Sequence, residues 1–182
     1  MQPEAAQRFE NFVVGSGNRL AVAAAQAVAE APGTVYNPLF IYSGSGLGKT
    51  HLVNAIGNLT RQIEPSLRVE YLTLDEFVDQ MHGAIASRRL NAFKDKFGKV
   101  DLLILDDAQF LTGKRETQSE LLRLLAAWQR SGKQLILTSD RPPAEIADVD
   151  ERLLTRLTGG LIVDIGPPDY ETRLAILQRK CE

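Results

Sequence analysis

The sequence predicts an α/β protein in which five parallel strands form a sheet with helices on both faces. Two patterns and one motif support this fold class. Short apolar segments alternate with longer helical ones along the chain of 182 residues. Residues 102–105 are apolar at every position, as expected of a strand buried on both faces of a parallel sheet. Residues 39–50 read as a strand, a glycine-rich turn and the start of a helix, which is a βα unit.

Strands and helices are expected to alternate from residue 18 to residue 180. The expected strands are residues 39–42, 69–74, 102–105, 135–138 and 161–165. The expected helices are residues 18–30, 49–63, 75–86, 88–97, 116–131 and 150–157, with a closing helix after Pro167 and Pro168 that runs through residue 180. Residues 1–15 form a polar lead-in, and residues 1–182 as a whole are expected to be one domain.

Local chemistry supports several of these boundaries. The alanine-rich helix over 18–30 is stopped by Pro32 and Gly33. Thr73, Asp75 and Glu76 are residue types that cap the start of a helix. The helix over 116–131 is amphipathic, with four apolar residues at helical spacing. These are Leu121, Leu122, Leu125 and Trp128.

Composition narrows the class of protein. Hydrophobic residues make up 44% and charged residues 24%, which is ordinary for a globular domain. The net charge of −2 argues against a surface that is basic overall and would attract nucleic acid everywhere. The single Cys181 excludes an internal disulfide and fits a reducing compartment. No apolar run reaches membrane-spanning length, and residues 1–12 lack the order of a signal peptide. We therefore expect a cytoplasmic protein without a membrane segment.

Residues 43–50 indicate a phosphate-binding loop. The usual pattern is G-x-x-x-x-G-K-[ST], and Ser43 occupies its first position, where a small residue is expected to permit the turn. Backbone N–H groups of such a loop cradle phosphates, Lys49 reaches the β- and γ-phosphates, and the Thr50 hydroxyl ligates Mg²⁺. The predicted nucleotide-binding residues here are Gly44, Ser45, Gly46, Leu47, Gly48, Lys49, Thr50 and His51. An ordinary glycine-rich connection is the alternative.

An acidic pair follows the third predicted strand. Asp106 is expected at the carboxyl end of that strand, where ligands of open α/β sheets collect, and it would hold the Mg²⁺ through water. Asp107 is then placed to orient or activate the attacking water. Two adjacent carboxylates in a solvated turn are the alternative, but a preceding apolar strand and a partner in Lys49 favour the functional interpretation.

Two further candidates come from the layout. The fourth strand is expected beside the third, so Ser139 or Asp140 at its end would reach the γ-phosphate or its water; a simple turn cap before the prolines explains the same residues. Arg152 and Arg156 share one helical face, and an exposed guanidinium there could act as an arginine finger on a neighbouring subunit. A surface salt bridge to Asp150 or Glu151 is the alternative for this pair.

Six motifs in order resemble one family over nearly the whole chain. They are residues 9–15 (FENFVVG) with Asn18, 36–42 (YNPLFIY), 46–52 (GLGKTHL), 106–111 (DDAQFL) with Lys114, 138–143 (TSDRPP) and 167–173 (PPDYETR). The chain is thereby similar to the AAA+ ATPase domain of the DnaA family of bacterial replication initiators. The resemblance implies a P-loop fold of the AAA+ type, a three-layer αβα sandwich.

The resemblance also implies ligands and roles. ATP or ADP would bind with its base near Val14, Gly15 and Asn18. Asp140 would belong to the first sensor motif, and Arg156 would occupy the arginine-finger position that completes the site of a neighbouring copy. Together these imply an ATP-dependent oligomerising switch with slow, Mg²⁺-dependent hydrolysis, acting on origin DNA at the start of replication.

The sequence departs from the family in two segments besides Ser43. The family reads Arg-Phe-x-Trp-Gly-Leu where this chain has residues 156–161 (RLTGGL), and loss of the aromatic pair is expected to loosen the segment that presents Arg156. The family's helical insertion, which grips single-stranded DNA, corresponds to residues 75–97. The apolar position that touches DNA in the family corresponds to His82 in this chain, and the family's basic partner position corresponds to Glu116. An acid at that second position would repel the DNA phosphates.

A local basic cluster could offset that repulsion. It consists of Arg88, Arg89, Lys94, Lys96 and Lys99. A solvated helix face balanced by Asp95 is an equally good interpretation of these residues.

The family continues into a helical lid with a second sensor arginine and then a duplex-reading domain, neither of which is among the 182 residues, so we expect a fragment of a longer protein. Three rivals to the initiator function stay open. One is a DnaA-related regulator that contacts the initiator without melting DNA, and another is a helicase loader with the same core. The third is a non-enzymatic scaffold with a vestigial pocket, against which the intact Lys49, Asp106 and Asp107 argue.

Overall fold

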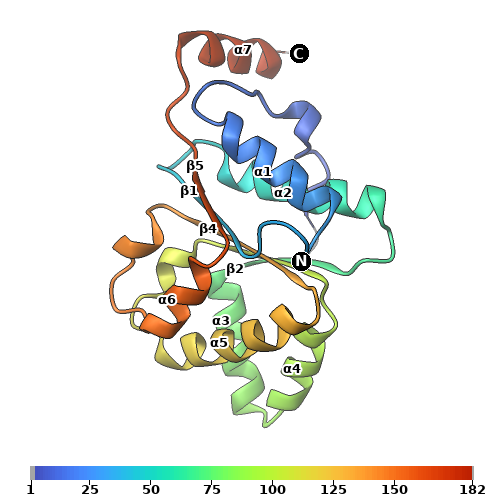
Figure 1. The fold of residues 1–182 in the computed structure, drawn as a ribbon, viewed down its shortest axis with the longest axis vertical. Helices are drawn as coiled ribbons and strands as arrows, with labels where there is room; N and C mark the ends of the chain where they lie inside the picture. Colours follow the sequence, from blue (N-terminus) through green and yellow to red (C-terminus); the bar gives the residue numbers. More distant parts are fainter. Residues whose placement is uncertain (1–2, 182) are drawn as a thin grey trace.

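Five parallel strands form the central sheet of the computed structural model, which describes residues 3–181 (Figure 1). The strands are β1 (Leu39–Tyr42), β2 (Val69–Thr73), β3 (Leu102–Asp106), β4 (Gln134–Ser139) and β5 (Leu161–Asp164). Their order is β2-β3-β4-β1-β5, and each neighbouring pair is parallel. The predicted sheet is confirmed, including the position of β4 beside β3.

Helices cover both faces of this sheet (Figure 1). The first face carries α1 (Arg19–Glu30) and α2 (Lys49–Ile63). The second carries α3 (Leu74–Ala86), α4 (Leu90–Gly98), α5 (Arg115–Arg130) and α6 (Glu151–Leu157). A last helix, α7 (Tyr170–Cys181), lies next to the N-terminal segment, and short 3-10 turns span Phe9–Asn11, Ala108–Leu111 and Pro143–Glu145. The three-layer αβα fold is therefore the one that the sequence predicted.

The boundaries differ from expectation by a few residues at most, and one difference has a clear cause. Leu74 begins α3 instead of ending β2, because Thr73 is the N-cap of that helix. The Glu76 backbone N–H donates to the Thr73 hydroxyl at 3.2 Å, and the Glu76 carboxylate accepts the Thr73 backbone N–H at 2.8 Å. This reciprocal capping box satisfies two N–H groups that would otherwise lack partners and ends the strand at Thr73.

Strand β3 separates the two halves of the core. All five of its residues are buried, as the apolar run predicted. Leu103 and Leu105 pack into the cluster beneath α3, α4 and α5, whereas Leu102 and Ile104 pack beneath α1 and α2. Because alternate side chains of a strand point to opposite faces, one strand anchors both helical layers. Asp106, its last residue, is thereby held rigidly at the carboxyl end of the sheet.

The helices α3 and α4 form a pair inserted between β2 and β3. Three buried phenylalanines join them, with ring centroids 5.5 Å apart for Phe77 and Phe93, 5.2 Å for Phe77 and Phe97, and 4.7 Å for Phe93 and Phe97. The tilted and edge-to-face ring arrangements are those that aromatic pairs prefer. The insertion expected over residues 75–97 is therefore a packed helix pair spanning residues 74–98.

Removal of the central ring of this cluster should destabilise the domain. We expect Phe97→Ala to lower the free energy of unfolding by about 3–5 kcal/mol, because a fully buried phenylalanine leaves a cavity when truncated. Ile85→Ala, on the exposed side of α3, should change it by less than about 0.5 kcal/mol. Urea denaturation followed by circular dichroism measures both values. Equal losses in the two variants would contradict the role given to the aromatic cluster.

Candidate nucleotide-binding site

The loop between β1 and α2 has the backbone that an anion site needs. Gly46 and Gly48 have φ values of 76° and 100°, a region that residues with side chains rarely adopt. A Cβ atom on Gly48 would also lie 2.9 Å from the ring of Phe12. The loop leads directly into α2 at Lys49, so its N–H groups lie at the positive end of the helix dipole. This geometry suits a phosphate chain.

Ser43 fits the first position of the loop without strain. It is buried, and it is not among the residues with positive φ. Its hydroxyl donates to the Gly44 carbonyl at 3.0 Å, and its backbone N–H donates to the Ser139 carbonyl at 3.1 Å. The expectation that a small residue permits the turn is confirmed, because this position does not need the conformational freedom of glycine.

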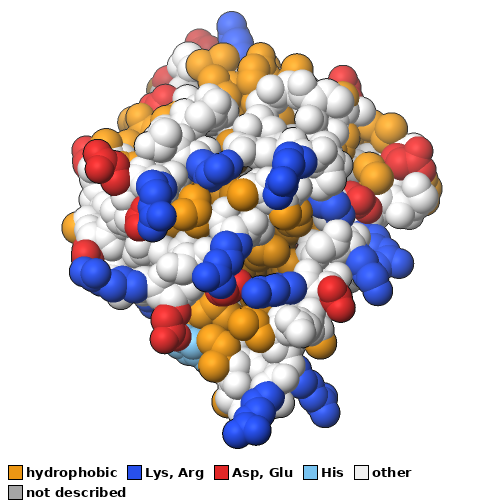
Figure 2. Space-filling view, turned by 60° about the horizontal axis from the view of Figure 1, so that its bottom comes forward, with side chains coloured by type: hydrophobic (Ala, Val, Ile, Leu, Met, Phe, Trp, Pro, Cys, Tyr) orange, Lys and Arg blue, Asp and Glu red, His pale blue; other side chains and the backbone are white. Residues whose placement is uncertain are grey.

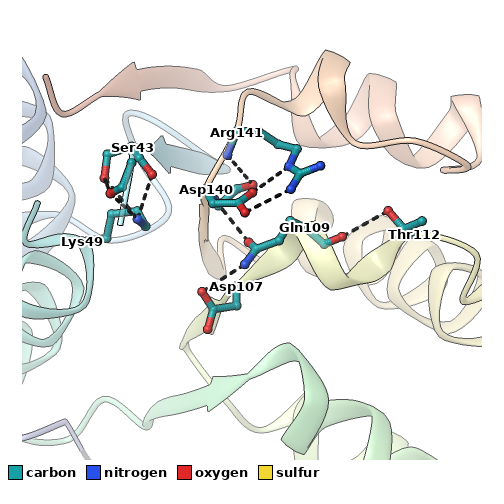
Figure 3. Close-up of polar contacts among 9 residues, drawn as sticks. Ser43, Lys49, Asp107, Gln109, Thr112, Asp140 and Arg141 are labelled. Atoms are coloured by element: carbon teal, nitrogen blue, oxygen red, sulfur yellow. Dashed lines mark hydrogen bonds and ion pairs between the residues drawn. The ribbon is translucent and has the colours of Figure 1, made fainter. Parts of the chain in front are cut away.

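The Lys49 ammonium group lies inside the loop (Figure 3). Its Nζ donates to the carbonyl oxygens of Ser43 and Gly44 at 2.9 and 3.0 Å, and it lies 3.2 Å from the Ser43 hydroxyl. These carbonyl oxygens carry a partial negative charge, and the oxygens of a bound phosphate would carry a larger one. The lysine is therefore held against the loop that precedes it, and its contact with phosphate stays a prediction.

Asp106 connects this loop to two other strands. Its Oδ2 accepts from the Thr50 hydroxyl at 3.0 Å and from the Tyr71 hydroxyl at 2.5 Å, and its Oδ1 accepts from the Thr138 hydroxyl. Burial, followed by the hydrogen bond to Asp106, raises the pKa of Tyr71, so that phenol remains a donor at neutral pH. Thr50 and Asp106, the two predicted Mg²⁺ ligands, therefore lie within hydrogen-bond distance of each other, and their metal-binding role stays a prediction.

Asp107 has a different environment from that of Asp106. Its φ of 63° is in the left-handed region, and its backbone N–H donates to the Thr138 hydroxyl at 3.0 Å. Its carboxylate accepts from Gln109 Nε2 at 3.3 Å (Figure 3). Burial, and secondarily the neighbouring Asp106, raises the pKa of Asp107 above its ordinary value. A carboxylate shifted in this direction is a better proton acceptor, which suits the water-activating role predicted for it.

Asp140 follows the end of β4, as predicted, and its carboxylate pairs with the neighbouring Arg141. The guanidinium donates from Nε to Oδ1 at 2.7 Å and from Nη2 to Oδ2 at 3.1 Å, and this hydrogen bonding lowers the pKa of Asp140. The Asp140 backbone N–H donates to Gln109 Oε1 at 3.3 Å. The alternative interpretation of these two residues was a turn cap before the prolines. Ser139 makes such a cap, because its hydroxyl accepts the Arg141 backbone N–H at 3.2 Å.

A cavity of about 700 Å³ adjoins the phosphate loop. Its walls come from the N-terminal segment, the loop, the end of the fifth strand and α7, and they include Phe12, Val13, Asn18, Leu47, His51, Ile165, Thr172 and Ile176. Asn18 thus lines the cavity as expected, together with His51. Val14 and Gly15 do not line this cavity, whereas Val13 does. Val14 is half exposed, and Gly15 donates its N–H to the Asn18 side-chain oxygen at 2.9 Å.

Three site residues were not identified from the sequence. Tyr71, Thr138 and Gln109 all bond to the acidic pair or to Asp140. Thr138 could have been found, because it ends a strand expected to lie beside Asp106. Tyr71 and Gln109 carry no comparable signal, since their side-chain directions depend on strand register and on the turn after β3.

The two arginines of α6 are held differently. Arg152 donates to the Asp150 carboxylate at 3.1 and 3.0 Å and lowers the pKa of Asp150 to about 2. Arg156 instead donates to the neutral Gln129 amide on α5 at 2.5 Å. The surface salt bridge that was the alternative for this pair is therefore made by Arg152. Arg156 is not brought to the Lys49 site of its own chain.

The surface around the α3–α4 pair is mixed in charge. On the face in Figure 2, Lys and Arg side chains are spaced around exposed hydrophobic ones, and acidic side chains lie among them. Lys94 pairs with Glu120 at 3.9 Å and Lys96 with Glu70 at 3.8 Å, so these acids, and not the expected Asp95, balance the cluster. His82 and Glu116 are both exposed. Arg88 and Arg89, at the turn between the helices, are exposed as well.

Within residues 3–181 there is no group of three or more His, Cys, Asp and Glu side chains arranged to hold a metal. Mg²⁺ on a nucleotide needs fewer protein ligands, because phosphates and water supply most of its oxygens. Thr50 and Asp106, with two oxygens converging next to Lys49, fit that kind of site.

None of the helices within residues 3–181 is both long enough and apolar enough to cross a membrane.

The parallel sheet, the phosphate loop and the acidic tip of the third strand define a P-loop nucleotide-binding domain. The family of the bacterial DnaA ATPase domain matches residues 4–164, and the chain belongs to this family.

Known relatives agree with this assignment. The replication initiator DnaA of Corynebacterium aurimucosum is 51% identical over 172 residues, which are 94% of this chain and 32% of the relative. DnaA of Thermus thermophilus is 50% identical over 96% of this chain and 40% of the relative. The crystal structure of domain III of Thermotoga maritima DnaA superposes with a TM-score of 0.95 at 45% identity, covering 98% of this chain and 75% of that one.

One solved relative contains ligands. A DnaA structure described as bound to AMPPCP and single-stranded DNA superposes with a TM-score of 0.92 at 40% identity, covering 98% of this chain and 55% of that one. DnaI and the DnaC helicase loader share the fold alone with this chain, at 18% and 13% identity. The chain spans about a third of the length of the curated relatives it matches.

Proposed function

We propose that this domain binds ATP and ADP with Mg²⁺ and hydrolyses ATP slowly, as the nucleotide switch of a DnaA-type replication initiator. The observation that carries the proposal is the convergence of Lys49, Thr50 and Asp106 at the glycine loop. The relative that contains AMPPCP supports it, since that compound is an ATP analogue and the two chains share the fold at 40% identity.

Each residue has a separate role in this proposal. The loop N–H groups and Lys49 bind the phosphates, while Thr50 and Asp106 hold the Mg²⁺, which neutralises charge on the phosphate oxygens. Asp107 accepts a proton from, or orients, the attacking water, and Asp140 responds to the γ-phosphate. The base enters the cavity lined by Asn18 and His51.

The free thiol of Cys181 suits the reducing cytoplasm, where we assign the protein.

Removal of the loop lysine should abolish nucleotide binding. We expect Lys49→Ala to weaken ATP binding by at least about a hundredfold, because the ammonium group makes charge-assisted bonds to two phosphates. Isothermal titration with Mg²⁺-ATP measures the loss. Lys133→Ala, outside the loop, is the control and should bind like the wild type. ATP binding of equal strength in wild type and Lys49→Ala would overturn the proposed site.

We further propose that Arg156 acts in trans, on the nucleotide site of a neighbouring copy. Among residues 3–181 its guanidinium bonds only to the neutral Gln129 amide, so its release costs less than that of Arg152, which is bonded to a carboxylate. The departure at residues 157–161 does not unwind this helix, because Leu153 and Leu157 of α6 are buried. The side chain is thus presented from an ordered element.

The two arginines provide a matched test of that role. We expect Arg156→Ala to lower the ATPase rate at high protein concentration by about tenfold or more, because an arginine finger stabilises transition-state charge. ATP affinity at low concentration should stay unchanged. Arg152→Ala, one helical turn away, should retain the wild-type rate at both concentrations. A rate independent of protein concentration, with both variants active, would rule out action in trans.

We also propose that the α3–α4 pair contacts single-stranded DNA, as part of opening or organising origin DNA. A relative at 40% identity binds single-stranded DNA. In this chain the exposed Arg88 and Arg89 lie at the tip of the pair, whereas Lys94 and Lys96 are engaged by acids. The exposed Glu116 weakens this contact and favours the rival function, a regulator that binds replication proteins without melting DNA.

Charge reversal at the tip distinguishes the two functions. We expect the double variant Arg88→Glu, Arg89→Glu to weaken ATP-dependent binding of an oligothymidylate by about tenfold or more at low salt, because phosphate contacts and their counterion release are lost. The control is Arg68→Glu, Arg130→Glu, which changes net charge equally at two exposed arginines elsewhere. Fluorescence anisotropy measures binding. No binding by the wild type at low salt would favour the regulator.

A further inference from the structure

We propose that Gln109 is a positioning residue that joins Asp107 to the end of β4 and so links the water-activating carboxylate to the γ-phosphate sensor. The inference rests on the proposed ATPase function. Gln109 lies in the 3-10 turn Ala108–Leu111 that follows the acidic pair, and its side chain is half-buried. Figure 3 shows its amide between Asp107 and Asp140.

The amide contacts one group on each side. Gln109 Nε2 donates to Asp107 Oδ1 at 3.3 Å, and Gln109 Oε1 accepts the backbone N–H of Asp140 at 3.3 Å. A carboxylate oxygen only accepts and a backbone N–H only donates, so a single orientation of the amide satisfies both. The pair of contacts therefore requires a donor and an acceptor on one planar group, which glutamine has and glutamate lacks.

The link spans two segments with separate supports. Asp107 is held through its backbone by the Thr138 hydroxyl, whereas its carboxylate receives the Gln109 bond. The Asp140 carboxylate is occupied by Arg141, which leaves its backbone N–H to Gln109. Both bonds of the amide, at 3.3 Å, are slightly longer than a typical N–H···O bond, so a movement of either partner can shorten or break them. A displacement of Asp140 is thereby transmitted to the orientation of the Asp107 carboxylate.

The turn that carries Gln109 does not depend on the amide. The Phe110 N–H donates to the Asp107 carbonyl at 3.2 Å, and the Thr112 hydroxyl donates to the Gln109 carbonyl at 3.2 Å. Ala108 and Leu111 are fully buried and fix the turn to the core. A change of the amide alone should therefore leave the fold intact and alter only the link.

The test uses the near-isosteric variant Gln109→Glu together with Gln109→Ala. Glutamate keeps the acceptor for Asp140 but cannot donate to Asp107, and it adds a like charge beside it. We expect both variants to lower the single-turnover rate of ATP hydrolysis by about tenfold, the scale set by one lost hydrogen bond to a charged group. The dissociation constant for Mg²⁺-ATP should stay within about twofold of the wild type, since the amide bonds neither to the loop residues 43–50 nor to the proposed Mg²⁺ ligands Thr50 and Asp106.

Thr112→Ala is the matched control, because it removes a bond to the backbone of Gln109 and leaves the amide in place. It should hydrolyse ATP at the wild-type rate. Wild-type hydrolysis by Gln109→Glu would overturn the inference and leave the proposed function standing. An equal loss in Thr112→Ala and Gln109→Ala would also overturn it, by assigning the effect to the turn. A wild-type protein that binds ATP without hydrolysing it would overturn the ATPase function and this inference together.

A double-mutant cycle identifies the partner through which Gln109 acts. In the background of Asp107→Ala, the further change Gln109→Ala should leave the residual rate unchanged within about twofold, because the carboxylate it positions is gone. A further tenfold loss in that background would show action independent of Asp107 and would overturn the link.

Discussion

The hydrogen bond from the Thr50 hydroxyl to Asp106 is the contact on which the site depends. It joins the first turn of α2 to the tip of β3 and so fixes the phosphate loop relative to the acidic pair. Asp106 can serve as this fixed point because β3 is buried on both faces and carries the two halves of the core. The rigidity of the site is therefore a property of the packed sheet and does not belong to the loop alone.

Hydroxyl groups organise the acids around that point. Tyr71 and Thr138 both donate to Asp106, and Thr138 also accepts the backbone N–H of Asp107. One carboxylate is thus held by three donors, while its neighbour receives a single side-chain hydrogen bond from Gln109 among the described residues. Adjacent aspartates consequently differ in their hydrogen bonding, and burial raises the pKa of Asp107. This difference agrees with the separate roles proposed for the two carboxylates.

The departures from the family pattern are accommodated by local structure. Ser43 has an ordinary backbone conformation and uses its hydroxyl within the loop, so the missing glycine does not disturb Lys49. Leu157, the last residue of α6, replaces an aromatic residue but is still buried in the core. Acids also lie near the α3–α4 pair, where Glu120 and Glu70 approach Lys94 and Lys96 at 3.9 and 3.8 Å.

Much of the fold and the centre of the site could be predicted, because the signals are local. The apolar run of β3, the glycines before Lys49 and the cap at Thr73 each act within a few residues of the chain. Tyr71 and Gln109 could not be predicted in this way, and neither could Val13 as a wall of the cavity. Their roles depend on side-chain direction at the sheet edge and on how the N-terminal segment lies across the loop.

By itself the sequence determined the order of strands and helices and the chemical type of the candidate phosphate and metal ligands, since hydrophobic periodicity and a contiguous motif encode both. Only the tertiary structure decided which side chains share hydrogen bonds at the strand ends. The bonds that Tyr71, Thr138 and Asp140 make join residues 31 to 35 positions apart. Such pairs meet only because the strand order places β2, β3 and β4 side by side with their carboxyl ends at one edge.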